Sequence, residues 1–165
     1  MIKENVLIAF APVGLTTYTV PEGVTTIGKA TFYNCTSLAS ITIPESVTTI
    51  GDYAFADCSS LASITLPESL TTIVDRVFLD CTSLVSITIP EGVTMIGYRA
   101  FSGCTSLKSV YCKPTTPPTG SDMFYNNASG RKIYVPASDD NSIIKAYKAA
   151  SGWSDYAADI VEYQF

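Results

Sequence analysis

A 23-residue repeat runs through most of the chain and limits its fold more than any other feature. A cysteine recurs at this interval, and so does a Pro-Glu pair. A fixed period of roughly 20 to 50 residues is typical of a solenoid, in which each unit buries its apolar face against its neighbours. The repeat therefore predicts a stack of coils. The equivalent positions are Cys35, Cys58, Cys81 and Cys104, and Pro21-Glu22, Pro44-Glu45, Pro67-Glu68 and Pro90-Glu91.

Each unit predicts one short strand followed by a turn. From Ser40 to Ile43, polar residues alternate with apolar ones and β-branched side chains are frequent, as in half-buried strands. We expect Ile41 and Ile43 to point into the core, and Ser40 and Thr42 to point outward. Pro44 has no N–H to give to a ladder and therefore ends the strand. Stacked units then align their strands into a parallel sheet with a spacing of about 4.8 Å.

One unit departs from the pattern after its strand. Val74 stands where Gly28, Gly51 and Gly97 stand in the other units. The backbone at Val74 either avoids a positive φ, which a β-branched residue disfavours, or is locally strained. We predict that Val74→Gly is nearly neutral if this φ is negative and stabilising if it is positive.

The length of 165 residues suits one cooperative domain, which we divide into three parts. The first part caps the first coil, the second is the solenoid, and the third packs on the last coil, whose apolar face needs a cover. These parts are residues 1–14, 15–112 and 113–165.

The third part is predicted to differ from the repeats. Residues 131–136 form a strand candidate that extends the sheet, and a helix is expected from about residue 143 to 151. Asp139, Asp140 or Ser142 can cap the start of this helix. The segment after the helix is then expected to fold back on the last coil.

Composition argues against two classes of protein. The chain has 10 basic residues, 15 acidic residues and no histidine, which gives a net charge of −5. Nucleic-acid binding needs a dense Lys/Arg surface and is therefore not expected. No run approaches the ~18 apolar residues of a membrane span. The N-terminal apolar stretch, with an Ala-x-Ala at residues 9–11, follows an acidic residue and is too short for a signal peptide.

Catalysis and cofactors find no support in the motifs. No serine or cysteine lies in a nucleophile motif beside a base, and no phosphate loop or nucleotide motif is present. The cysteine column lacks the Cys-x-x-Cys spacing of zinc sites, so we interpret its members as small buried side chains. The repeated glutamates favour solvated carboxylates over a bound cation. We expect no enzyme activity, no cofactor and no metal site.

The outward positions of the strands give a first candidate binding surface, which we call the hydroxyl face. In the expected solenoid this surface is the concave one. Rows of hydroxyl groups suit a protein or a glycan, although serine and threonine are equally ordinary as outward residues of strands. The residues of the hydroxyl face are Ser40, Thr42, Ser63, Thr65, Ser86, Thr88, Ser109 and Tyr111.

A second candidate surface, the exit region, lies where the chain leaves the repeats. Basic and aromatic residues together favour an interface. On the convex side, Tyr53 and Arg76 of neighbouring units can form a cation–π contact, although drift on an exposed face also explains the variation there. The exit-region residues are Lys108, Lys113, Arg131, Lys132 and Tyr134.

The repeat motif also indicates a family. The segments 50–58 (IGDYAFADC) and 96–104 (IGYRAFSGC) each follow a strand of the form Leu-x-x-Ile-x-Ile-Pro or a close variant. In these residues the chain resembles the BspA-like class of leucine-rich repeats, named after bacterial surface protein A. Residues 133–136 and 146–153 resemble the closing module of these proteins. The resemblance implies a mainly β, right-handed leucine-rich-repeat solenoid with a parallel concave sheet of 23-residue coils and a small α/β C-terminal cap.

The resemblance implies a function as well. Members of the family are mostly surface or secreted proteins of host-associated bacteria, and some bind host matrix or plasma proteins. We expect a non-catalytic, adhesin-like module, at the cell surface or secreted, that binds a host extracellular protein or glycan as a monomer. Two alternatives remain: a structural spacer that displays another domain and binds nothing, and an accessory module of a larger enzyme.

Overall fold

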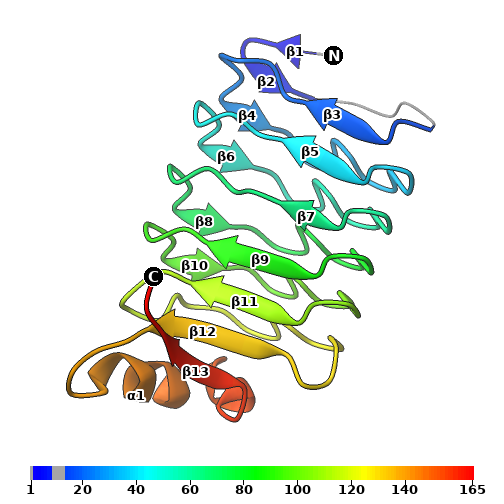
Figure 1. Cartoon of the computed structure of the whole chain (residues 1–165). Helices are drawn as coiled ribbons and strands as arrows, with labels where there is room; N and C mark the ends of the chain where they lie inside the picture. The colour runs from blue at the N-terminus through cyan, green and yellow to red at the C-terminus, as the bar shows by residue number, and fades with distance from the viewer. Residues whose placement is uncertain (1, 9–13) are drawn as a thin grey trace.

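The computed structural model describes residues 2–8 and 14–165 of the chain. The strands stack coil upon coil along one axis, with the N-terminus at one end and the helix α1 (Ser142–Ala149) at the other (Figure 1). Among the described residues, strands of successive coils pair in parallel, as in β3 with β5 and β9 with β11. The predicted mainly β solenoid with parallel sheets is confirmed.

One row of strands forms the side of the solenoid that bears the hydroxyl face. Ser40 pairs in register with Ser63 and Ile41 with Ile64. The isoleucines are buried and the serines are exposed, so the predicted alternation is confirmed. The strands of this row are β3 (Thr17–Thr19), β5 (Ser40–Thr42), β7 (Ser63–Ile64), β9 (Ser86–Ile89), β11 (Ser109–Cys112), β12 (Lys132–Pro136) and β13 (Ile160–Tyr163).

A second row of shorter strands follows the proline turns. At its N-terminal end, β1 and β2 form an antiparallel hairpin, and β2 pairs with the first coil through Leu7 and Ile27. This hairpin belongs to the N-terminal cap predicted at residues 1–14, of which residues 1 and 9–13 lie outside the described residues. The strands of the second row are β1 (Ile2–Lys3), β2 (Val6–Leu7), β4 (Thr26–Ile27), β6 (Thr49–Ile50), β8 (Thr72–Ile73) and β10 (Met95–Ile96).

The third side of each coil is a turn that buries a phenylalanine. Neighbouring rings lie nearly parallel, with centroid separations of 5.1 to 5.6 Å, and backbone hydrogen bonds such as that from Phe55 N to Val77 O (2.9 Å) join the turns. The stacked rings fill the core along the whole solenoid. The members of this column are Phe32, Phe55, Phe78, Phe101 and Phe124.

The cysteine column lies against these turns. Three of its thiols donate a hydrogen bond to a phenylalanine carbonyl of the preceding coil, as from Cys81 Sγ to Phe55 O (3.1 Å), and Cys58 and Cys104 repeat the contact. These thiols are buried and unoxidised, so the interpretation as small buried side chains is confirmed, while Cys35 is half-buried. Burial raises the pKa of the Cys58 and Cys104 thiols to about 12.

The coil that contains β7 and β8 departs from the regular stack. Within the described residues, β7 pairs with β5 but not with β9, and β8 pairs with β10 but not with β6. Gly97 N donates to Ile73 O (2.7 Å), whereas the equivalent N–H of Val74 has no such bond to Ile50 O in the described part of the chain. Both rows of strands are therefore interrupted beside this coil.

The side chain of Val74 explains the interruption between β6 and β8, and nothing in the described part of the structure explains the one between β7 and β9. A Cβ built on Gly97 lies 2.5 Å from the backbone of Val74 and Asp75, and one built on Gly51 lies 2.6 Å from Lys29 N. Glycine is therefore required here for close approach to the preceding coil, and Val74, whose φ is not positive, holds the coils apart. A small apolar cavity lies beside the break, lined by residues that include Ile50, Leu70, Val74 and Phe78.

The solenoid continues past residue 112, where the repeats were expected to end. Thr119 bridges in parallel to Met95, and Ile96 N donates to Thr119 O (2.8 Å). Phe124 then takes the next place in the phenylalanine column. Residues 113–126 thus close a further coil despite their Pro-rich sequence, because the backbone groups that join coils do not depend on the repeat motif.

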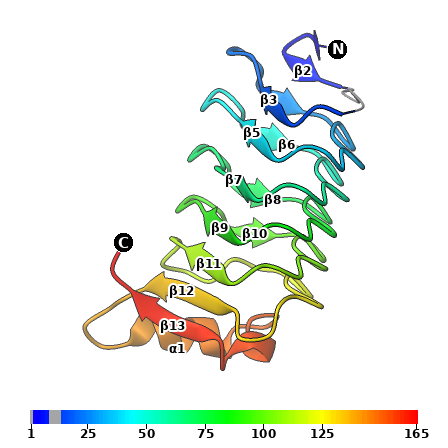
Figure 2. The same cartoon turned by 45° about the vertical axis from the view of Figure 1, so that its right-hand side comes forward.

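The C-terminal segment covers this last coil. Helix α1 and the 3₁₀ helix η1 (Ser154–Tyr156) lie beneath β12 and β13 at the end of the stack (Figure 2). Asp140 accepts from Ser142 N (2.9 Å) at the start of α1. The buried Trp153 donates through Nε1 to Pro118 O (2.6 Å), and Tyr147 donates to Pro114 O (2.8 Å). None of the helices in residues 2–8 and 14–165 is long and apolar enough to cross a membrane.

The raised thiol pKa values predict a loss of stability at alkaline pH. The thiols of Cys58 and Cys104 ionise near pH 9 in the unfolded chain but near pH 12 in the folded one. Their contribution to the unfolding free energy is therefore fully present below pH 9 and is lost as the pH rises towards 12. Between pH 8 and pH 10 each thiol is expected to cost about 1 kcal/mol of unfolding free energy. Urea denaturation of the wild type and of a Cys58→Ala/Cys104→Ala variant measures this, and equal pH slopes for the two proteins would contradict it.

The close approach at Gly97 predicts a cost for any side chain there. Gly97→Ala forces a Cβ into the backbone of Val74 and Asp75 and is expected to destabilise the protein by about 1–3 kcal/mol. Gly92→Ala is the matched control, because its Cβ lies 3.5 Å from Leu70 O, an ordinary contact. Urea denaturation of both variants tests the explanation, which fails if the two substitutions have the same effect.

At Val74 the structure selects the first of the two expected outcomes. Because φ of Val74 is not positive, Val74→Gly relieves no left-handed strain and is expected to change the unfolding free energy by less than about 1 kcal/mol. Closer packing of the two coils offsets the flexibility that glycine adds. Chemical denaturation measures the change, and a larger stabilisation would reveal strain that the backbone angles do not show.

Candidate binding surface

The hydroxyl face runs across the coils in two segments, one on β5 and β7 and one on β9 and β11, because β7 and β9 do not pair in the described part of the chain. Ser109 pairs with Ser86 and Tyr111 with Thr88, so equivalent positions of β9 and β11 form rows that cross these strands. Figure 1 shows the two strands side by side. The exposed members are Ser40, Thr42, Ser63, Thr65 and Thr88, and the half-buried members are Ser86, Ser109 and Tyr111. The structure thus brings together the residues that the sequence assigned to this surface.

The glutamates beside this strip make contacts between coils. Glu45 accepts a hydrogen bond from the backbone N–H of Glu68 (3.0 Å), and Glu68 in turn pairs with Lys113 Nζ at 2.6 Å. No cluster of potential metal ligands occurs among the described residues. The carboxylates therefore bound the hydroxyl face at one edge, and the side chains of the face itself are uncharged.

At its C-terminal end the hydroxyl face meets a cluster of aromatic rings. Tyr111 and Tyr134 stack with centroids 4.8 Å apart, and Tyr163 contacts both edge-on at 5.5 and 5.4 Å. Phe165 extends the cluster by an edge contact with Tyr163 at 5.1 Å. After β13 the chain turns back towards the end of β11 (Figure 1), which places its last residues above the sheet.

Tyr111, Tyr163 and Phe165 line a shallow hollow that is open to solvent, which we call the aromatic groove. Its volume is about 400 Å³, within the range of small-ligand sites. A second hollow of about 280 Å³ lies on the other side of the same C-terminal residues, next to Glu91 and Pro136. The residues of the aromatic groove are Thr88, Tyr111, Lys113, Tyr163, Gln164 and Phe165.

The exit-region residues do not form a single patch. Lys108, directly before β11, and Lys132, at the start of β12, are exposed and joined by the hydrogen bond from Lys132 N to Lys108 O (2.8 Å). Tyr134 and Lys113 belong with the hydroxyl face and its groove. Arg131 is only 5% exposed, so it does not present its charge to solvent.

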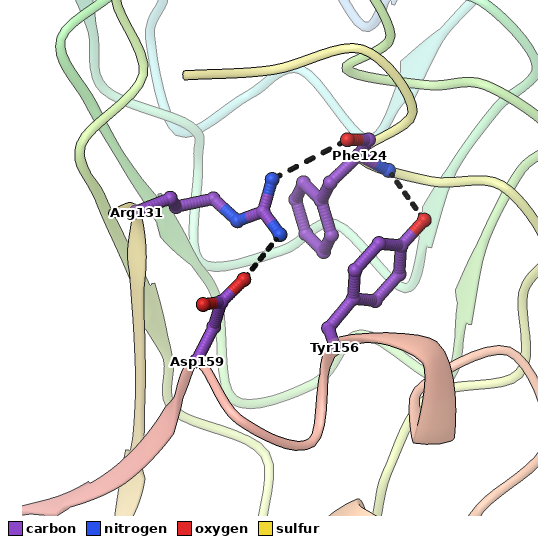
Figure 3. A network of polar contacts seen from close by, with 4 residues as sticks. All are labelled: Phe124, Arg131, Tyr156 and Asp159. Atoms are coloured by element: carbon purple, nitrogen blue, oxygen red, sulfur yellow. Dashed lines mark hydrogen bonds and ion pairs between the residues drawn. The ribbon is translucent and has the colours of Figure 1, made fainter. Parts of the chain in front are cut away.

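Arg131 instead fastens the C-terminal cap (Figure 3). Its guanidinium pairs with Asp159 at 2.8 Å, donates to Phe124 O and lies over the rings of Phe124 and Tyr156. Tyr156 OH accepts from Phe124 N (3.3 Å) in the same network. Because the Arg131 side chain is nearly closed to solvent while Asp159 is partly exposed, loss of the carboxylate would leave a buried cation without its partner, and Arg131 therefore has a structural role.

The convex side bears a ladder of alternating arginine and tyrosine side chains. The predicted contact of Arg76 with Tyr53 is confirmed at 5.6 Å, and Arg76 also lies 4.9 Å from the ring of Tyr98. Arg99 lies 5.0 Å from both Tyr98 and Tyr125, which extends the ladder beyond the pair that the sequence indicated. These contacts join one coil to the next.

Three groove residues escaped the sequence analysis. Tyr163, Gln164 and Phe165 lie in the segment after the helix, and no repeat position predicts where they lie. The signal that was available is a weak one: β13 has the β-branched and aromatic composition of a strand, which would have placed it next to β12. The turn of the chain after β13 could not have been read from composition.

Comparison with known proteins agrees with this architecture. The model of the BspA type leucine rich repeat region matches residues 7–146 in six copies. The chain belongs to the BspA-type leucine-rich repeat family. The resemblance inferred from the repeat motif is therefore confirmed. A search of the curated proteins gave no match.

Solved structures of bacterial leucine-rich repeat proteins are similar to this BspA-type chain. A leucine rich cell surface protein of Faecalibacterium prausnitzii shares 33% identity at a TM-score of 0.77, over 89% of this chain and 38% of that one. The leucine rich repeat protein of T. pallidum shares 28% identity at 0.69, over 90% of this chain and 69% of that one. The pneumococcal vaccine antigen PcpA, at 23% identity and a TM-score of 0.71 over 98% and 45%, shares the fold.

The BspA-type chain is thus a leucine-rich-repeat module related to bacterial surface leucine-rich-repeat proteins. It spans 38% of the length of the Faecalibacterium protein and 45% of PcpA.

Proposed function

We propose that this chain is a non-catalytic binding module of a bacterial surface or secreted protein, adhesin-like, that takes an extracellular protein or glycan on its hydroxyl face as a monomer. The observation on which the proposal rests is the geometry of that face: uncharged hydroxyl groups stand in register on stacked strands and end at an aromatic groove. Aromatic side chains are enriched at interfaces, so the cluster at the end of the strip favours a recognition surface there.

Two further observations support this choice of surface. The second row of strands presents short segments whose side chains alternate between the core and solvent without an aromatic cluster among the described residues. The convex ladder has its arginines engaged with tyrosines of the same chain. The similarity to a protein described as a leucine rich cell surface protein supports the proposed location.

A variant that introduces charges on the hydroxyl face tests the proposal. The purified chain is screened against matrix proteins, plasma proteins and a glycan array, beside a variant with Ser63→Glu, Thr65→Lys and Ser86→Glu. We expect saturable binding by the wild type and a loss of at least about tenfold in the variant, because buried unpaired charges at an interface are costly.

A matched control separates the effect of the surface from that of charge. The variant with Thr36→Glu, Thr82→Lys and Thr105→Glu introduces the same charges at exposed positions on the turns that follow the cysteines. It is expected to bind like the wild type, and both variants should keep the wild-type melting temperature. Absence of binding across the whole panel would favour a structural spacer, and equal loss in both variants would remove the hydroxyl face as the site.

A further inference from the structure

The geometry of the aromatic groove points to a more specific ligand: we infer that it takes the end of an uncharged oligosaccharide, by stacking a sugar ring on the exposed aromatic side chains. This inference rests on the proposed function, because the rest of the glycan would lie along the hydroxyl face. The repeat motif does not indicate this class of ligand, because the residues of the motif form the core.

The rings of the groove and its border contact one another. Tyr111 and Tyr134 stack on each other, and Tyr163 and Phe165 lie edge-on in sequence beyond them. Even so, Tyr163 is 42% exposed and Phe165 is 55% exposed, so part of each ring faces solvent. A pyranose ring has C–H groups on its faces, which pack on aromatic rings.

The polar groups of the groove match the rim of a sugar. Thr88 offers a hydroxyl group, Gln164 offers an amide that both donates and accepts, and Tyr111 and Tyr163 add phenolic hydroxyls. These groups lie around the aromatic surface within a volume of about 400 Å³. A few polar groups at the border of an apolar hollow are the usual composition of a small-ligand site.

Charge decides between neutral and acidic ligands. Within the described part of the chain, Lys113 is the single charged side chain that lines the groove, and Glu68 pairs with it at 2.6 Å. The charge of Lys113 is therefore paired with a carboxylate of the same surface. Glu91 borders the neighbouring hollow, and the whole chain has a net charge of −5. The negative potential here would repel an acidic glycan, whereas it would not repel a neutral one.

The continuity of the groove with the hydroxyl face decides between a glycan and a protein partner. Thr88 belongs to both surfaces and lies on β9, and the hydroxyl groups of β7 lie beyond the edge of β9 that does not pair among the described residues. Apart from Tyr111, which lines the groove itself, the hydroxyl face consists of serine and threonine and has no tryptophan or arginine that would anchor a protein interface. A chain of neutral sugars can follow such a strip by hydrogen bonds while its end stacks in the groove.

A glycan array followed by calorimetry tests the inference on the complete chain. The probes are neutral glycans and their sialylated or sulfated counterparts, and the free disaccharides of the glycans that bind are then titrated. The wild type is compared with Tyr163→Ala and with Tyr125→Ala, whose tyrosine is 55% exposed on the convex side. Melting temperatures of both variants confirm that they fold.

The inference expects binding of neutral glycans in preference to acidic ones, a loss of roughly tenfold in affinity for Tyr163→Ala, and no change for Tyr125→Ala. If glycans bind and only the variant with charges introduced on the hydroxyl face loses this binding, the groove is not the subsite and the proposed function stands. Binding of proteins alone, or a preference for acidic glycans, also overturns the inference and leaves the proposed function intact. Silence in every assay overturns both.

Discussion

The contact between the backbones of successive coils is the constraint on which the rest of this structure depends. Each coil satisfies its peptide groups by bonding to the next, as from Gly51 N to Ile27 O (2.8 Å), so the coils must lie at strand spacing. At that spacing there is no room for a side chain where the backbones meet, which is why a Cβ on Gly51 or Gly97 would collide with the preceding coil. The same spacing brings the phenylalanine rings to stacking distance and three of the thiols to a carbonyl of the coil before them.

The sequence predicts this regular part well because the same pattern of apolar and polar residues recurs in several units. Alternation from Ser40 to Ile43 is enough to separate core from surface, and the outward rows follow from the 23-residue interval without any tertiary information. The break beside Val74 shows where such reading ends. The sequence shows that Val74 replaces a glycine. The effect of this replacement depends on the distance between the backbones of neighbouring coils and not on φ. That distance is a property of the assembled stack and cannot be predicted from one unit.

The C-terminal end shows the same limit more strongly. The repeat motif fades after residue 112, yet the coil continues, since Thr119 and Phe124 keep the backbone bonds and the ring contact without the motif. Arg131 looked like a surface cation because arginine is usually exposed, but Asp159 and two aromatic rings surround it. Partners that lie far away in sequence decide such cases, and a single sequence does not name them.

Residues at repeated positions and residues of the irregular C-terminal segment contribute differently to the fold and to recognition. A column of identical side chains gives every coil the same surface, and the resulting face can hold an extended partner but cannot mark a position along it. Only where the repeat stops does the chain acquire a local shape, since Tyr163 and Phe165 have no counterparts in the regular coils. A ligand that runs along the strip would therefore find its register at the aromatic groove. The irregular end that closes the solenoid is thus also the place where specificity can arise.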